Sequence, residues 1–306
     1  MKKIKEINIS DKQYPELLKN IKKPPSKLYV MGNIDILNEK AIAIVGSRKA
    51  TSKGEKIAKS ISRDTSLQGI NTISGMALGI DSAVHIGTIE AGGKTIAVLG
   101  SGFNKIFPEE NKKLFKTIIN TGGAVVTEYS PNTSWCSENF RQRNRIVSGL
   151  SIGVLVIEAA YRSGTAITVQ YAKKQNKKVF CIPHEIDNKN GIGTNKFIRE
   201  GAILVSNIEE IMQEYGQYEV KKDLKIKQLK NIQKIKIEKE YKKLYDIITE
   251  IPINIEEVVK KSKENISEAN SKLLIISYLY YYYYVLRYSI YMAMILAIYC
   301  VVLYIL

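Results

Sequence analysis

The segment that most constrains the fold is residues 41–48, in which five apolar residues run directly into Gly46, Ser47 and Arg48. A continuous apolar run of this length is typical of a parallel strand that is buried on both faces. The Gly-Ser pair predicts a tight turn, and helical spacing resumes from Gly54. A turn between a strand and a helix N-terminus gathers backbone N–H groups and the positive end of the helix dipole. We therefore expect an anion to bind here, with Arg48 at the rim.

Apolar runs alternate with helical patterns from residue 41 to about residue 210, which predicts an α/β fold with a parallel sheet flanked by helices. Because strand crossovers are right-handed, the glycine turns should lie together at the carboxyl edge of this sheet, where open α/β folds bind ligands. The expected strands are residues 41–45, 70–73, 95–99, 124–127, 152–157, 178–182 and 202–205, and the expected helices include residues 54–66, 79–91, 109–120 and 164–175.

A second turn follows the strand expected at residues 70–73, where Ser74 and Gly75 offer a hydroxyl and an unobstructed backbone for another anion contact. Asp81 and His85 are one helical turn apart, so their side chains can pair. Such a pair could orient the helix or act as a catalytic dyad, although the sequence shows no nucleophile near it.

Two further glycine motifs do not match nucleotide sites. The segment from Gly100 to Gly102 follows an expected strand but lacks the third glycine of a dinucleotide fingerprint. The segment Gly92-Gly93-Lys94 fails as a P-loop because it enters a strand instead of leaving one. We therefore expect neither a nicotinamide enzyme nor an ATPase, and we expect no cofactor and no metal.

A third turn region, residues 140–150, holds three arginines within five residues beside Phe140 and close to Trp135. Cations together with aromatic faces suit single-stranded nucleic acid, because phosphates meet the cations and bases stack on the rings. A solvated basic loop is the alternative for this segment. Its apolar flanks favour a position near the other turns.

A fourth turn follows the strand expected at residues 152–157. Here Arg162 precedes Ser163, Gly164 and Thr165 at the start of an expected helix. A cation beside a Ser-Gly-Thr turn makes a suitable nest for a phosphate. Four such turns at one sheet edge predict a pocket with more basic than acidic groups.

The formal net charge of +16 favours a polyanionic partner. Much of the surplus lies in the lysine-rich residues 221–243, which either contact DNA or form a solvated spacer. The three cysteines, Cys136, Cys181 and Cys300, have no paired spacing, and the N-terminus does not resemble a signal peptide. Both observations predict a cytoplasmic protein.

The composition also predicts how the chain is divided. Residues 1–36 form a small loop-rich or helical lead-in, and residues 37–213 carry the α/β pattern. Residues 214–237 are typical of a charged linker. Residues 238–276 predict the short helices of a partial winged-helix-like module.

The final segment, residues 277–306, is dominated by Tyr, Ile and Leu, and Arg287 is its only charged residue. Residues 288–306 carry no charge and are long enough to cross a bilayer. The tail is therefore either a membrane anchor, which would make the protein membrane-associated, or a frameshift product, because out-of-frame A/T-rich codons yield this composition.

In order and spacing, the motifs of roughly residues 10–210 resemble the DNA-processing protein A family (DprA, also called Smf). The resemblance implies an extended Rossmann domain that binds single-stranded DNA without enzymatic turnover. It also implies a homodimer that protects incoming DNA and hands it to a RecA-type recombinase in natural transformation. The matching stretches are residues 45–48, 74–85, 93–100, 107–111, 143–151 and 163–165.

The resemblance also implies which residues contact DNA. Arg48 would contact a backbone phosphate, with Gly46 and Ser47 shaping its turn. Two positions depart from the family pattern, namely His184 after Pro183 and Lys53 before Gly54. The expected DNA-binding residues are Gly46, Ser47, Arg48, Ser74, Gly75, Phe140, Arg143, Asn144, Arg145, Arg162, Ser163, Gly164 and Thr165.

The competing class is a nucleotide phosphoribohydrolase with a similar Rossmann core. Such enzymes carry a Gly-Gly-x-Gly-Thr-x-x-Glu turn, and the comparable turn here runs from Arg162 to Thr168. Thr168 stands where the catalytic acid would be, so hydrolysis would lack its carboxylate. We therefore expect a binding protein and not an enzyme.

Overall fold

The computed structural model describes residues 3–160 and 163–216, together with Ser262, Glu268, Ser271 and Lys272. The chain divides into two compact units, Met1–Glu219 and Val220–Leu306, and nearly all of the described residues belong to the first. In the part of the chain described, no helix is long and apolar enough to span a bilayer. Nearly all of the expected linker and winged-helix-like module, and the whole apolar tail with its span at residues 288–306, lie outside the described residues.

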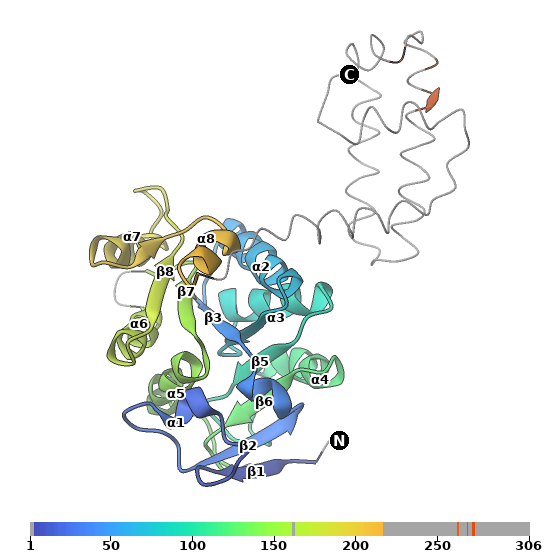
Figure 1. The fold of residues 1–306 in the computed structure, drawn as a ribbon, viewed down its shortest axis with the longest axis vertical. Coiled ribbons are helices and arrows are strands. Elements are labelled where there is room, and N and C mark those ends of the chain that lie inside the picture. The colour runs from blue at the N-terminus through green and yellow to red at the C-terminus, as the bar shows by residue number, and fades with distance from the viewer. Residues whose placement is uncertain (1–2, 161–162, 217–261, 263–267, 269–270, 273–306) are drawn as a thin grey trace. The chain divides into compact units, whose positions relative to one another are not determined.

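A nine-stranded sheet organises the described part of the first unit (Figure 1). Its order is β1-β2-β6-β5-β4-β3-β7-β8-β9, with β3 to β9 parallel and the β1-β2 and β2-β6 pairs antiparallel. The strands are β1 (Lys5–Asn8), β2 (Lys27–Gly32), β3 (Ala41–Val45), β4 (Asn71–Ser74), β5 (Thr95–Val98), β6 (Ala124–Thr127), β7 (Gly153–Val156), β8 (Lys178–Cys181) and β9 (Ile203–Leu204).

Helices cover both faces of this sheet. Residues of α1, α5, α6 and α7 pack in one hydrophobic cluster, while α2, α3 and α8 pack in a second on the opposite face, and α4 forms a third with the outer strands. The helices are α1 (Glu16–Lys19), η1 (Asp35–Asn38), α2 (Ser52–Leu67), α3 (Ile80–Glu90), η2 (Glu109–Asn111), α4 (Lys112–Asn120), α5 (Ser137–Leu150), α6 (Thr165–Lys174), α7 (Ile192–Arg199) and α8 (Ile208–Gln213).

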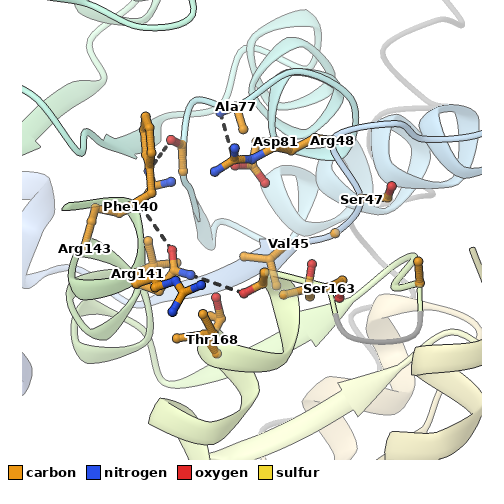
Figure 2. A pocket seen from close by; sticks show the side chains of 18 of the residues that line it. Val45, Ser47, Arg48, Ala77, Asp81, Phe140, Arg141, Arg143, Ser163 and Thr168 are labelled. Atoms are coloured by element: carbon orange, nitrogen blue, oxygen red, sulfur yellow. Dashed lines mark hydrogen bonds between the residues drawn. The ribbon is translucent and has the colours of Figure 1, made fainter. Parts of the chain in front are cut away.

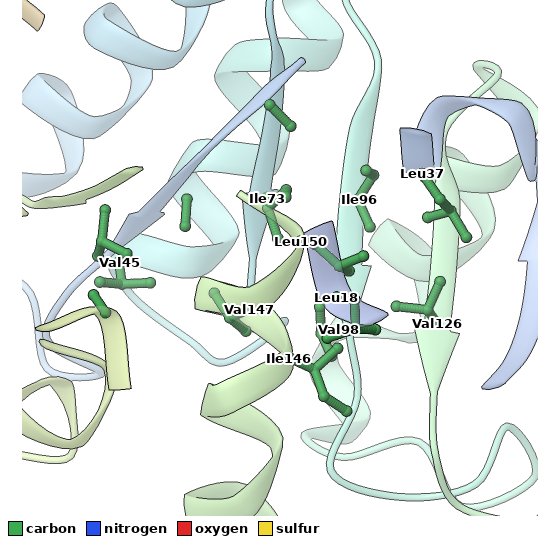
Figure 3. Close-up of a cluster of buried hydrophobic side chains, with 14 of the residues drawn as sticks. Leu18, Leu37, Val45, Ile73, Ile96, Val98, Val126, Ile146, Val147 and Leu150 are labelled. Atoms are coloured by element: carbon green, nitrogen blue, oxygen red, sulfur yellow. The ribbon is translucent and has the colours of Figure 1, made fainter. Parts of the chain in front are cut away.

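The central strand β3 shows why the apolar run folds as it does. Ala41, Ala43 and Val45 face the cluster that includes α5, and Ile42 and Ile44 face the cluster that includes α2. Strand residues alternate between faces, so a strand covered on both sides needs an apolar residue at every position. Figure 3 shows the first cluster, where the α5 residues Ile146, Val147 and Leu150 lie over the strands.

The predicted α/β fold with a parallel sheet is confirmed. All seven expected strands are present as β3 to β9, with each boundary within one residue of its expected position. Residues 1–36 are more than a lead-in, because β1 and β2 extend the same sheet and α1 packs on α5, where Leu18 contacts the backbone of Gly149. Residues 137–150, part of which we expected as a turn, form the helix α5.

The strand order creates the crevice that holds the candidate site. From β3 the chain builds outward through β4 and β5 to β6, and it then returns to place β7 on the other side of β3. The loops after β3 and β7 therefore run away from each other at the carboxyl edge. Open α/β sheets bind ligands at such a switch point.

Candidate nucleic-acid interface

An open pocket of about 640 Å³ lies at this switch point. Its walls are the loops after β3, β4 and β7, the start of α6 and one side of α5, and Figure 2 shows their side chains converging. Of the residues predicted to bind DNA, the structure brings ten to this pocket: Gly46, Ser47, Arg48, Gly75, Phe140, Arg143, Asn144, Ser163, Gly164 and Thr165.

Arg48 is one of the exposed cations of the pocket. Its side chain is exposed, and it has no hydrogen bond or ion pair within the described residues. The guanidinium carbon lies 5.0 Å from the centre of the Phe140 ring, within cation–π range. The turn beneath it is anchored, because Ile80 N–H donates to the Ser47 carbonyl (3.1 Å) and Gly79 packs against the backbone of Ser47 and Arg48. A fixed backbone therefore presents an exposed guanidinium, whose charge also acts on the nearby buried Asp81.

The helix N-terminus behind this turn is not available to a ligand. The fully buried carboxylate of Glu158 accepts hydrogen bonds from the N–H and the hydroxyl of Thr51, the residue that caps α2. Gly54 leaves room for that carboxylate, because the Cβ of any other residue at this position would clash with it. The expectation that the N-terminus of α2 holds the anion is therefore wrong, because an internal carboxylate already occupies that place.

The N-terminus of α6 differs, because no acidic side chain of the described residues is bonded to it. Its first turn carries no acidic residue. Thr165 and Thr168 line the pocket with only 6% and 3% of their surface exposed, and neither hydroxyl has a hydrogen-bond partner among the described residues. Asn144 Nδ2 donates to the Gly164 carbonyl (3.4 Å) and ties this turn to α5. Arg162, which we expected beside this turn, lies outside the described residues.

Arg143 lines the pocket, but its side chain is buried and stabilises the fold. It is 3% exposed, and its guanidinium donates to the carbonyls of Gly75 and Val98, at the ends of β4 and β5. Burial lowers the pKa of Arg143 to about 10, and the neighbouring Asp81 opposes that shift, so the group stays charged at neutral pH. A Cβ on Gly75 would lie 2.6 Å from both Arg143 and Asp81, which explains the glycine. Arg143 thus joins α5 to two strands.

Asp81 belongs to the same buried group, and its expected pairing with His85 is not made. Burial raises the pKa of Asp81, while the nearby Arg143 charge and the N–H of Ala77 (3.2 Å) act against that shift. The His85 ring Nδ1 instead lies 2.7 Å from the Thr95 hydroxyl, and burial lowers its pKa to about 3. His85 is therefore a neutral core residue.

Two of the residues predicted to bind DNA lie away from the pocket lining. Arg145 forms a two-pronged ion pair with Glu128 (2.7 and 2.6 Å) and donates to the carbonyl of Lys23 (3.0 Å), so it ties α5 to the N-terminal segment. The hydroxyl of Ser74 donates to the Ile44 carbonyl (2.7 Å) inside the sheet.

Other residues of the pocket are absent from the set expected to bind DNA, although Arg141 is one of the three arginines noted in residues 140–150. The exposed Arg141 lines the pocket from α5, with no side-chain partner among the residues described. Residues 137, 140, 141 and 144 are spaced i, i+3, i+4 and i+7, the spacing of one helix face, so a helical interpretation of this segment would have found Arg141. Lys49, Ala77 and Asn190 also line the pocket, and Asn190 Nδ2 donates to the Lys49 carbonyl (2.7 Å).

Among the described residues, the site therefore combines exposed cations, an aromatic ring and hydroxyls without a partner, with Asp81 as the single acidic residue in its lining. Within the described residues, no group of three or more His, Cys, Asp or Glu side chains is placed to hold a metal ion. The fold and this site define a Rossmann-like α/β protein with a pocket at its switch point that is lined by several cations.

The chain belongs to the DNA recombination-mediator protein A family, whose model matches residues 5–216. It is 38% identical to Protein Smf of Escherichia coli over 200 residues, which are 65% of this chain and 54% of that protein. The chain thus matches about half of the length of this relative.

Solved structures resemble the same part of the chain. DNA processing protein A of Streptococcus pneumoniae has a TM-score of 0.65 and 36% identity, with 69% of this chain and 74% of that one covered. DNA processing protein A of Helicobacter pylori, a protein with a described single-stranded DNA binding mode, has a TM-score of 0.63 and 26% identity, with 70% and 96% covered.

Proposed function

We propose that this chain binds single-stranded DNA in the switch-point pocket and acts in DNA processing, without catalysing a reaction there. The observation that carries this proposal is Arg48, an exposed guanidinium with no partner among the described residues, held above Phe140 by an anchored turn. Family membership and the described single-stranded DNA binding mode of the Helicobacter pylori relative support it.

Each group in the pocket has a role in this proposal. Arg48, Lys49 and Arg141 neutralise backbone phosphates. The hydroxyls of Thr165 and Thr168, at the N-terminus of α6, donate hydrogen bonds to a further phosphate. Phosphates and ring faces carry no base sequence, so the pocket binds strands of any sequence.

The competing function, hydrolysis of a nucleotide, lacks support from the geometry. A hydrolase of this kind needs a carboxylate that can reach the substrate. Asp81 is buried between Arg143 and the Ala77 N–H, and Thr168 stands where the phosphoribohydrolase turn has its acid. Turnover of nucleoside monophosphates by the purified chain would support the enzyme instead.

By family membership, the proposal extends to partners and setting. We propose that the chain works as a homodimer in the cytoplasm, protects incoming single strands and loads a RecA-type recombinase during natural transformation. Sedimentation velocity tests the dimer. Strand exchange by a RecA-type recombinase on protein-coated single strands tests the loading.

Fluorescence anisotropy with labelled (dT)12 tests DNA binding by the full chain across a salt series. Arg48→Ala should weaken binding at least tenfold, and the slope of log K against log salt should fall by about one. The matched control is Arg63→Ala on α2, which removes an exposed arginine that does not line the pocket. Unchanged binding by Arg48→Ala, or binding that ignores salt, would contradict the proposal.

A further inference from the structure

Three aromatic rings extend from the pocket along the molecular surface. Phe140, beneath Arg48, lies 5.9 Å from Phe107, and Phe107 stacks on Trp135 with ring centres 4.1 Å apart at an interplanar angle of 27°. Trp135 and Phe140 are 6.3 Å apart, so each ring neighbours the other two. Phe107 and Trp135 are absent from the pocket lining, and Trp135 is 48% exposed. The rings therefore form a cluster, called the aromatic stack below after its stacked Phe107–Trp135 pair, in which Phe140 lines the pocket and Trp135 reaches the surface.

This stack is held rigidly by two loops that are hydrogen-bonded to each other. Gly102 N–H donates to the Thr133 carbonyl (2.9 Å) and Asn104 N–H donates to the Pro131 carbonyl (2.8 Å). Gly102 has no room for a Cβ, which would clash with the carbonyls of Ser130 and Pro131. The loop that carries Phe107 thus cannot separate easily from the loop that carries Trp135.

Gly100, just before the loop that carries Phe107, leaves room for the Phe140 ring. A Cβ on Gly100 would lie 2.7 Å from the Phe140 ring. The glycines that look like a broken dinucleotide fingerprint in the sequence therefore serve the aromatic stack, one by admitting Phe140 and the other by joining the loops.

An exposed, rigid indole beside a cationic pocket has few structural uses. The Trp135 side chain is not needed for packing of the core, since nearly half of its surface faces solvent. Aromatic faces next to phosphate-binding cations stack bases of any sequence. We infer that Trp135 is a stacking platform for a nucleobase of the strand as it leaves the pocket, with Phe107 supporting the indole from behind. This inference rests on the proposed binding of single-stranded DNA.

Trp135 is the single tryptophan of the chain, so the intrinsic tryptophan fluorescence of the full chain reports this position alone. Titration with (dT)12 should quench that fluorescence. An abasic oligomer of the same length supplies the phosphates without bases, and at saturation it should leave the fluorescence nearly unchanged. Equal quenching by the two oligomers, or saturation with (dT)12 without quenching, would overturn the inference.

Variants separate stacking from a structural effect. In anisotropy measurements Trp135→Ala should bind (dT)12 about fivefold to tenfold more weakly, whereas its affinity for the abasic oligomer should not change. Trp135→Phe should retain most of the affinity, because a ring remains. Leu67→Ala, a similarly exposed apolar residue on α2, is the control and should match the wild type.

The outcomes also distinguish the two proposals. Binding of (dT)12 by the wild type with no loss in Trp135→Ala overturns the stacking platform and leaves the pocket proposal standing. Absence of any binding by the wild type overturns both.

Discussion

Two helices begin at the same edge of the sheet, after neighbouring strands, and their N-termini differ completely. At α2 the capping Thr51 is bonded to the buried carboxylate of Glu158, so a negative group of the protein satisfies the helix. At α6 the first turn has no acid, and Thr165 and Thr168 face the pocket without partners among the described residues. Similar strand-turn-helix sequences have thus produced one helix N-terminus that is bonded to an internal carboxylate and one that, in the described residues, is not.

The comparison extends to the arginines around the pocket. Arg143 donates to two backbone carbonyls, while Arg48 has no hydrogen bond or ion pair in the described part of the chain; the charges of both act on the buried Asp81. A buried charge that is fully bonded supports the fold, whereas an exposed charge without a partner can bind a ligand. Substitutions should therefore divide into those that lower stability and those that lower affinity.

The largest effect is expected for Arg143→Met. The substitution removes the donor of the Gly75 and Val98 carbonyls and leaves Asp81 buried without its opposite charge. Loss of one partner of a buried charge pair costs about 3–5 kcal/mol of unfolding free energy. Urea unfolding measures the change, with Arg141→Met, an exposed arginine two residues earlier on α5, as the control. Equal stability of the two variants would show that Arg143 is not structural.

A smaller loss of stability is expected for Glu158→Ala. Thr51 then loses the acceptor of its N–H and hydroxyl, and the N-terminus of α2 loses its negative group. Hydrogen bonds to a charged partner contribute about 1.5–3 kcal/mol, so the free energy of unfolding should fall by about 2–3 kcal/mol. Glu158→Gln keeps the shape and one acceptor and should lose less. If both variants lost the same amount, the negative charge and not the bonding would account for the effect.

The strands of this fold were predictable because both faces of the sheet are covered. A strand such as β3 must then be apolar at every position, and that run is visible in a single sequence. The strands β1 and β2 were missed because they extend the sheet as antiparallel strands at one end, where several of their residues remain partly or fully exposed.

The site was less predictable because its decisive contacts join residues distant in sequence. Arg143 is buried on α5 by carbonyls 45 and 68 residues away, so a buried arginine broke the apolar periodicity and the helix was expected as a turn. Glu158 and Thr51 are 107 residues apart. Sequence reasoning correctly placed the turns at one edge, but it could not tell which charges are bonded internally.

The smallest effects are expected for two substitutions at the N-terminus of α6. Thr165→Val and Thr168→Val each remove one hydroxyl from this helix N-terminus and keep the shape of the side chain. Neither hydroxyl has a partner to lose among the described residues, so stability in urea should stay within about 0.5 kcal/mol of the wild type. Each should weaken (dT)12 binding about fivefold, because a single hydrogen bond contributes about 1 kcal/mol. Thr117→Val, on the exposed side of α4, is the matched control. Loss of stability without loss of affinity would show that these hydroxyls stabilise the fold, as the bonds between Thr51 and Glu158 do at α2. Phosphate binding would then depend on Arg48 and its neighbouring cations alone.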